Sequence, residues 1–162
     1  MDDKLKNSLL TVCRLLEKYK IDYMLIGGTA VALNGYYRLS QNTSGEITDK
    51  PDIDIWYNPT YDNYFNILKV MAELGQDITE FKNEQSPNPR ESFFRLHFDA
   101  FSLDLLPEIK ANIKFMEANK RKETIEWENT KIHFMTSSDL IEDKKVTARK
   151  KDLHDIEQLE KR

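Results

Sequence analysis

The alternating segment Asp52-Ile53-Asp54-Ile55 constrains the fold more than any other part of this sequence. Charged and branched apolar residues alternate there with a period of two, which predicts a strand over 52–57 with one buried face. Because successive side chains of a strand point to opposite faces, Asp52 and Asp54 project from the same side of the sheet. The isoleucines point the other way, toward the core. The chain therefore forms a sheet that carries two neighbouring carboxylates on one face.

The other elements follow from hydrophobic periodicity and from turn residues. Their mixture of helices and strands predicts an α+β or α/β fold, and no repeat or linker divides the chain, so we expect one domain over 1–162. The predicted order is helix 2–20, strand 23–26, helix 29–34, loop 41–50, strand 52–57, a helix opened by 58–60 and ending near 74, loop 83–90, hairpin strands 93–98 and 101–106, a weak helix 109–120, hairpin strands 124–127 and 131–135, and one last helix from Ser137 or Ser138 to about Leu159.

The composition fits a globular protein, since 40% of the residues are hydrophobic and 32% are charged. No apolar run approaches the roughly 18 to 20 residues that span a bilayer, so we expect no membrane partner. A signal-peptide pattern is missing, and the single cysteine, Cys13, cannot form an internal disulfide, which favours a cytoplasmic location. Cys13 is expected to be a buried helix residue. The net charge of −4 argues against a protein that coats nucleic acid, although a local basic site stays open.

The carboxylates indicate a cation site. Two adjacent carboxylates repel each other, and a hard cation such as Mg²⁺ removes that conflict because it prefers oxygen ligands. Asp104 lies within the apolar run 101–106, where a carboxylate is costly unless it is paired or bound to a cation. If its strand neighbours the strand at 52–57, three carboxylates converge, as a two-metal phosphoryl-transfer site requires. The alternatives are an exposed strand edge for the first two acids and an ion-paired edge position for Asp104.

A glycine turn, Gly27-Gly28-Thr29, follows the first apolar strand and precedes a short helix. Glycines let the backbone approach a phosphate closely, and a helix N-terminus offers free N–H groups. Thr29 can add a hydroxyl or cap the helix. The pattern is neither a Walker loop nor a dinucleotide fingerprint, because the further glycines and the lysine are missing. An ordinary tight turn is the alternative.

The last predicted helix has charged residues in the middle of an otherwise apolar stripe. With apolar residues at both ends, the charged centre is predicted to face the protein body, where Asp155 holds Lys151 and leaves Lys144 free to reach a phosphate. A solvated helix is the alternative, because residues 139–162 hold seven positive and seven negative side chains. The three histidines show no metal-ligand spacing and are predicted to be bystanders. The stripe is Leu140, Lys144, Ala148, Lys151, Asp155 and Leu159, and the histidines are His97, His133 and His154.

Taken in order, these motifs resemble the DNA polymerase β-like nucleotidyltransferase superfamily, and most of all its small bacterial branch with the abortive-infection-type toxins. That pattern is a strand, a glycine pair, a short helix, an Asp-x-Asp strand and a third carboxylate on a later strand. One departure is the 23 residues between Gly28 and Asp52, which we attribute to a loop insertion over Ser40–Lys50 that affects the position of Arg38. The matching segments, within 21–159, are Gly27-Gly28-Thr29-Ala30, Gly35-Tyr36-Tyr37-Arg38, Asp52-Ile53-Asp54, Asp104 and Lys144…Arg149-Lys150-Lys151-Asp152-Leu153-His154-Asp155-Ile156.

The resemblance implies a nucleotidyltransferase-like mixed β-sheet flanked by helices. It also implies an enzyme, dependent on Mg²⁺ or Mn²⁺, that transfers a nucleoside monophosphate from an NTP such as ATP to an acceptor hydroxyl. Asp104 is expected to help remove the acceptor proton as well. The implied site residues are Asp52, Asp54 and Asp104 for metal binding and catalysis, and Gly27, Gly28, Thr29 and Lys144 for the nucleotide phosphates.

The acceptor and the biological role stay open at this point. RNA or a protein hydroxyl suits a toxin–antitoxin protein, whereas a small molecule suits an antibiotic-modifying enzyme of the lincosamide or aminoglycoside type, which this chain also resembles. Because the chain lacks the extra helical domain of larger members, a homodimer or a partner protein is one way to complete the site. A non-catalytic interaction module with the same fold is a further alternative. A glycosyltransferase ranks last, because its fold needs a longer chain and leaves the glycine pair unexplained.

Overall fold

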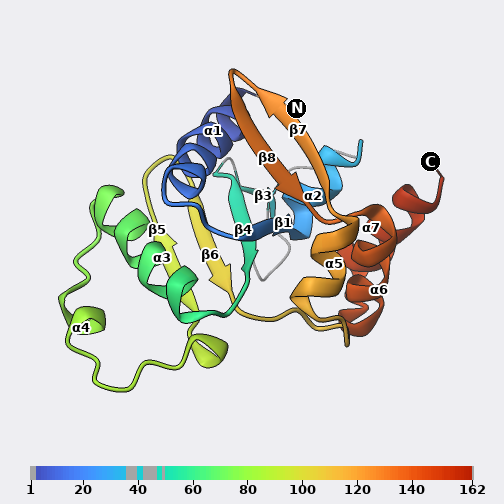
Figure 1. Cartoon of the computed structure of the whole chain (residues 1–162). Coiled ribbons are helices and arrows are strands. Elements are labelled where there is room, and N and C mark those ends of the chain that lie inside the picture. The colour runs from blue at the N-terminus through green and yellow to red at the C-terminus, as the bar shows by residue number, and fades with distance from the viewer. Residues whose placement is uncertain (1–2, 36–39, 42–46, 49, 162) are drawn as a thin grey trace.

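The computed structural model describes residues 3–35, 40–41, 47–48 and 50–161 (Figure 1). The elements in chain order are α1 Asp3–Lys18, β1 Tyr23–Ile26, α2 Gly27–Leu33, β2 Ser40–Gln41, β3 Ile47–Thr48, β4 Asp52–Tyr57, α3 Tyr61–Glu73, α4 Thr79–Lys82, a 3₁₀ turn Pro89–Glu91, β5 Phe94–His97, β6 Ser102–Leu106, α5 Phe115–Arg121, β7 Glu123–Trp127, β8 Thr130–Phe134, α6 Ser137–Thr147 and α7 Lys150–Glu160.

The strands form a six-stranded sheet in the order β5-β6-β4-β1-β8-β7. The β4–β6 and β1–β8 pairs are parallel, and the β5–β6, β1–β4 and β7–β8 pairs are antiparallel. The predicted mixed sheet flanked by helices is therefore confirmed. β2 and β3 form a separate two-stranded antiparallel ladder within the segment predicted as a loop insertion. Most of that segment, together with Arg38, lies outside the described residues.

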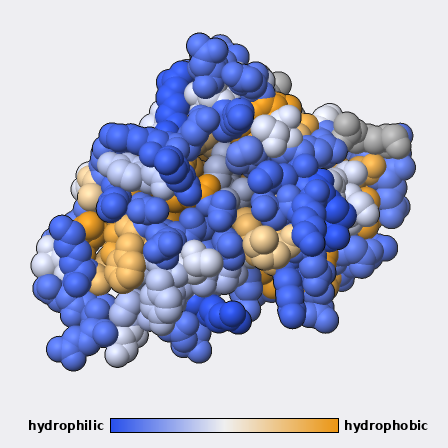
Figure 2. All heavy atoms as spheres, in the orientation of Figure 1, coloured by the Kyte–Doolittle hydropathy of each residue, from blue (hydrophilic) through white to orange (hydrophobic). Residues whose placement is uncertain are grey.

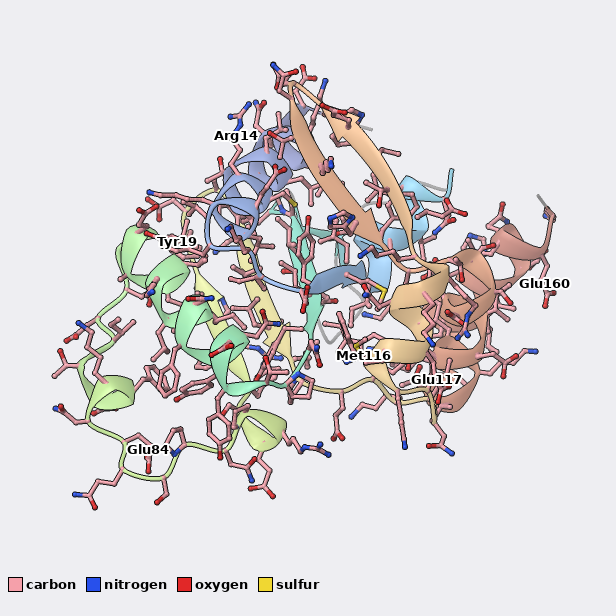
Figure 3. The ribbon with its side chains drawn as sticks, viewed as in Figure 1. Arg14, Tyr19, Glu84, Met116, Glu117 and Glu160 are labelled. Atoms are coloured by element: carbon pink, nitrogen blue, oxygen red, sulfur yellow. The ribbon has the colours of Figure 1, made fainter. Side chains whose placement is uncertain are left out.

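One face of the sheet packs against α1 and α3, which lie beside each other over the strands (Figure 1). The predicted inward residues Ile53 and Ile55 have no exposed surface. Burying an apolar side chain of this size contributes roughly 1.5–3 kcal/mol, so this face supplies much of the stability. Arg14 on α1 donates from Nε to Thr130 Oγ1 on β8 over 3.3 Å, which ties the helix to the sheet (Figure 3). Other fully buried members of this face are Leu9, Val12, Leu16, Leu25, Leu103 and Leu105.

Cys13 lies in this core, as predicted, and burial raises the pKa of its thiol to about 12. A thiol with so high a pKa holds almost no thiolate at neutral pH, so it is not a nucleophile. The face of the molecule shown in Figure 2 is mostly hydrophilic, with small apolar patches among polar side chains. No helix in the described part of the chain combines the length and the apolar character that a membrane span requires.

The two predicted hairpins are present. In the second, Glu128 and Asn129 both have positive φ angles, 47° and 62°, as a two-residue hairpin turn requires. The predicted helix over 109–120 is wrong at its start, because α5 begins only at Phe115. The preceding segment is held in an irregular path by Asp143, which accepts hydrogen bonds from the backbone N–H groups of Lys110 and Ala111.

The prediction of one long final helix is wrong. Thr136, rather than Ser137 or Ser138, caps α6 by accepting from the Asp139 N–H, and α6 ends where Ala148 adopts a left-handed conformation with φ 46°. The chain then turns into α7, whose first turn is closed by Asp152 accepting from the Arg149 N–H. The helical stripe predicted across both helices is therefore broken at Ala148. Leu140, Lys144, Asp155 and Leu159 are nevertheless buried, as the predicted inward-facing stripe required.

Candidate active site

The three predicted acids lie on one face of the sheet, on adjacent strands. Asp54 on β4 is the register partner of Asp104 on β6, and Asp52 lies opposite Ser102 in the same parallel ladder. Adjacent strands are about 4.8 Å apart, so side chains at partner positions converge on the same region. Asp52 is exposed, while Asp54 and Asp104 are half-buried. The strands that carry Asp54 and Asp104 are therefore neighbours, which is the arrangement that convergence of the three acids required.

The electrostatics of the cluster fit a divalent cation. Burial, followed by the charges of Asp104 and Asp52, raises the pKa of Asp54 to about 7. Burial and then Asp104 raise the pKa of Asp52 as well. Like charges held this close oppose ionisation, and a cation between them removes the opposition. Carboxylate oxygens are also the ligands that Mg²⁺ and Mn²⁺ prefer. The residues present therefore fit the implied metal.

Gly27 lies directly against this cluster. It has φ +64°, and a Cβ atom built on it would stand 2.5 Å from Asp54 Oδ2. Any other residue at this position would therefore be strained and would displace the carboxylate. β1 delivers the glycine to this place, because its last residue, Ile26, is the antiparallel partner of Asp54. The first glycine thus makes room for an acid, a role that the sequence pattern did not reveal.

Gly28 and Thr29 belong to the first turn of α2, which begins two residues earlier than predicted. Thr29 does not cap the helix. Its buried hydroxyl donates to the Asp52 carbonyl oxygen over 3.2 Å and so fixes α2 to the start of β4. The N-cap position, Ile26, makes no side-chain hydrogen bond to the first turn of α2. The glycine turn and the acid-bearing strand are therefore one connected unit.

Lys144 is not the free cation that the helical stripe predicted. Its side chain is 7% exposed, and Nζ lies 3.0 Å from Asp155 Oδ2 and 3.4 Å from Asp152 Oδ1. The prediction failed because the turn at Ala148 folds α7 back onto α6 and brings both acids to Lys144. Burial raises the pKa of Asp152, but Arg149, Thr147 and Lys144 together lower it well below its usual range. Lys144 is thus part of a buried ionic group that joins the two helices.

The turn between α6 and α7 nevertheless lies close to the acids. The positive charge of Lys144 lowers the pKa of Asp54, and the charge of Lys151 lowers the pKa of both Asp54 and Asp52. Arg149 has its own pKa raised, first by its hydrogen bond to Asp152 and also by the charge of Asp54. Sequence reasoning missed Lys151 as a site residue, because the assumed continuous helix assigned it to Asp155.

Arg95 is a further site residue that sequence reasoning missed. It is the antiparallel partner of Asp104 in the β5–β6 hairpin, and its guanidinium binds both carboxylate oxygens, with Nε–Oδ1 at 3.1 Å and Nη2–Oδ2 at 3.3 Å. The signal was available in the sequence, since Arg95 and Asp104 are equally distant from the predicted turn at 99–100. Asp104 is therefore ion-paired and also lies beside the other acids, but its predicted edge position is wrong, because β6 lies between β5 and β4.

His97 lies next to the acid cluster. It is the register partner of Ser102, which is in turn the partner of Asp52, so the three residues form a row across three strands. Its Nδ1 lies 3.3 Å from Ser102 Oγ, and its charge lowers the pKa of Asp52.

Among the described residues, no three His, Cys, Asp or Glu side chains already form a metal-binding group.

A hollow of about 460 Å³ lies near the other end of β4. Trp56, Pro107 and Phe115 line it, together with Met116, which projects from α5 (Figure 3). The rings of Trp56 and Phe115 pack edge to face with their centroids 5.3 Å apart. None of the three aspartates belongs to this lining, so the hollow and the acid cluster are separate features of the molecule.

No protein-family model matches the sequence, and no curated protein matches it significantly. The fold is similar to solved nucleotidyltransferases. The lincosamide antibiotic adenylyltransferase LnuA, solved with lincomycin bound, has a TM-score of 0.57 at 17% identity, over 99% of this chain and 96% of that one. The antibiotic-resistance factor ANT(2'')-Ia has a TM-score of 0.57 at 15% identity, over 98% of this chain and 84% of that one. An antigenic nucleotidyltransferase-like protein from Paracoccidioides brasiliensis has a TM-score of 0.55 at 13% identity, over 98% of this chain and 76% of that one. The chain therefore has a nucleotidyltransferase fold.

Proposed function

We propose that this chain transfers a nucleoside monophosphate from an NTP to an acceptor hydroxyl and releases pyrophosphate, in a reaction that depends on Mg²⁺ or Mn²⁺. The observation that carries the proposal is the pairing of Asp54 with Asp104 on adjacent parallel strands, with Asp52 on the same face and Gly27 against Asp54. The nucleotidyltransferase fold supports the same reaction class.

Asp52, Asp54 and Asp104 are the residues that would hold the divalent ions. Bound Mg²⁺ supplies positive charge that offsets the charge of the triphosphate and of the transferring phosphoryl group. Asp104 is the carboxylate that we assign to the acceptor side, where it accepts or helps to remove the proton of the attacking hydroxyl. It is suited to that role because it is half-buried and lies beside Asp54 on the adjacent parallel strand.

The backbone N–H groups of Gly27, Gly28 and Thr29 are assigned to the nucleotide phosphates, because they begin a helix beside the acids. Lys144 is assigned differently from the sequence-based expectation, since its ammonium already binds two carboxylates. Lys151 takes its place as the lysine directed at the triphosphate, because its charge acts on both Asp52 and Asp54.

For the acceptor, a small molecule with a free hydroxyl is the first candidate. The structure of LnuA contains lincomycin, and its match to this chain covers 99% of this chain and 96% of LnuA. LnuA is an adenylyltransferase, which makes ATP the first NTP to test. RNA or a protein hydroxyl, as expected of a toxin-like member of a toxin–antitoxin pair, is the second candidate. A homodimer or a partner protein would supply surface that this small chain does not. We place the protein in the cytoplasm, because its single cysteine is reduced and buried.

The test is transfer of label from each α-³²P-labelled NTP in the presence of Mg²⁺. Separate reactions contain a lincosamide, an aminoglycoside, total RNA or a cell extract, and the labelled product is separated by size. We expect one labelled acceptor class and release of unlabelled pyrophosphate. Asp54→Asn serves as the matched control, because it keeps the shape of the side chain and removes its charge. Single Asp→Ala changes at 52, 54 and 104 are expected to abolish transfer and leave the fold intact.

Three outcomes would contradict parts of the proposal. Absence of transfer with every NTP and acceptor, together with absence of stabilisation by Mg²⁺ and NTP, would favour the non-catalytic interaction module. Full transfer in Asp104→Ala would remove Asp104 from the mechanism. Transfer of label to RNA, together with RNA binding that weakens steeply as the salt concentration rises, would favour the toxin-like alternative over the small molecule.

A further inference from the structure

The contact between Arg95 and Asp104 has a consequence for metal loading. We propose that Arg95 competes with the divalent cation for Asp104, so that the third carboxylate is occupied by a side chain until metal displaces it. The inference rests on the proposed function, because it concerns the same acid cluster. It adds a regulatory residue that neither the fold nor the three acids specify.

The geometry makes the competition direct. The guanidinium engages both oxygens of Asp104 in two parallel hydrogen bonds, at 3.1 and 3.3 Å. This is the arrangement by which arginine binds carboxylates most strongly and with fixed orientation. A divalent ion that shares Asp104 with Asp54 would have to approach the same carboxylate, close to a positive charge already present. Binding of one cation therefore weakens binding of the other.

In the metal-free state, the positive charge of Arg95 acts against the negative charge of the acid cluster. Three carboxylates converge there, and Arg95 is the cation that touches Asp104 in the register row of β5, β6 and β4. Lys144 and Lys151 also act on Asp54 through their charges, but the ammonium of Lys144 is bound to Asp152 and Asp155. Arg95 therefore offsets part of the repulsion among the acids until a metal ion arrives.

The exposed position of Arg95 allows its guanidinium to move away from Asp104. Its side chain is 58% exposed, and its guanidinium lies over the ring of Phe93, with Cζ 5.2 Å from the ring centroid. Exposed ion pairs are weak, so a divalent ion that binds several carboxylates at once can displace one arginine. Metal is then expected to load most completely together with the nucleotide, whose phosphates add further ligands.

The experiment measures metal affinity directly rather than activity. Purified full-length protein is titrated with Mn²⁺, and free Mn²⁺ is followed by electron paramagnetic resonance, with and without ATP. The variants are Arg95→Ala and Arg95→Lys, and the matched control is Arg121→Ala. Arg121 makes an equivalent two-bond pair with Asp139, at 3.1 Å for both bonds, and is similarly exposed at 49%. It is not one of the residues assigned to the acid cluster.

We expect Arg95→Ala to bind Mn²⁺ about two- to fivefold more tightly than the unmodified protein without ATP, the size expected of one exposed ion pair. Arg95→Lys should fall between the two, because lysine keeps the charge but cannot form the paired hydrogen bonds. Arg121→Ala should bind Mn²⁺ as the unmodified protein does. Thermal melting without metal should show a loss of stability in both arginine-to-alanine variants, and added Mn²⁺ should recover more of it in Arg95→Ala.

Unchanged or weaker Mn²⁺ binding in Arg95→Ala would overturn the inference, and label transfer by the unmodified protein would then leave the proposed function intact. Tighter binding in Arg95→Ala without any label transfer would support the inference and count against the proposed function. A lack of Mn²⁺ binding by every variant, with or without ATP, would overturn both.

Discussion

The carboxylate of Asp54 occupies the space in which any residue other than glycine at position 27 would place its Cβ atom, 2.5 Å from Oδ2. Two segments that are far apart in the sequence thus depend on each other. The sharp turn after β1 needs a glycine for its positive φ angle, and the acid on β4 needs that glycine for room.

Gly27→Ala is therefore expected to reduce both stability and activity. The left-handed backbone costs about 1–3 kcal/mol for a non-glycine residue, and displacement of Asp54 adds to it. Gly75→Ala is the matched control, because Gly75 also has a positive φ, 94°, but has nothing within 4 Å of its Cβ position. Thermal melting should show a loss in both variants that is larger in Gly27→Ala. Label transfer should fall at least about a hundredfold in Gly27→Ala alone, by analogy with misplaced catalytic groups. Equal effects of the two substitutions would mean that the contact with Asp54 does not matter.

Asp54 gives the metal-free protein a pH dependence of stability. Its pKa is raised to about 7 in the folded protein, from its ordinary value of 3.8, so the folded state binds this proton more tightly than the unfolded state does. Stability from this group is therefore greatest below pH 4, falls as pH rises toward 7, and stays constant above that. Urea unfolding from pH 4 to 8 in EDTA should show a smaller fall in Asp54→Asn, and Mg²⁺ should reduce the fall in the unmodified protein. A slope that is identical in Asp54→Asn would assign the dependence to other groups.

Lys144→Met tests whether this lysine is structural. The substitution leaves Asp152 and Asp155 buried without their ammonium partner, which typically costs about 3–5 kcal/mol. Lys145→Met is the neighbouring control, because Lys145 is exposed and makes only a surface pair with Glu142, worth about 0–1 kcal/mol. Urea unfolding should separate the two variants clearly. Lost NTP binding with unchanged stability in Lys144→Met would instead restore the phosphate-binding role predicted from the sequence.

Ala148→Gly distinguishes two helices from one by the sign of its effect. Ala148 ends α6 with φ 46°, a conformation that glycine adopts without strain, so the substitution should stabilise the protein by up to about 1 kcal/mol. In the interior of a continuous helix the same change would cost about 1 kcal/mol. Thermal melting gives the sign. A lower melting temperature would contradict the turn between α6 and α7.

Features that depend on short-range periodicity could be predicted from the sequence. The alternation over β4 predicted its limits and the common face of Asp52 and Asp54, because the side-chain period of a strand is two wherever the strand lies. The β5–β6 and β7–β8 hairpins followed from their turns in the same way.

Which segments meet depends on long-range packing that the sequence pattern did not reveal. The parallel pairing of β4 with β6 joins Asp54 to Asp104 across 50 positions of sequence, and no local pattern fixes such a register. The break at Ala148 had no glycine or proline to mark it, since a left-handed alanine is tolerated where tertiary contacts, here the buried Lys144 with Asp152 and Asp155, stabilise the turn. Local periodicity sets the direction of each side chain, whereas burial and charge pairing between distant segments set its partner.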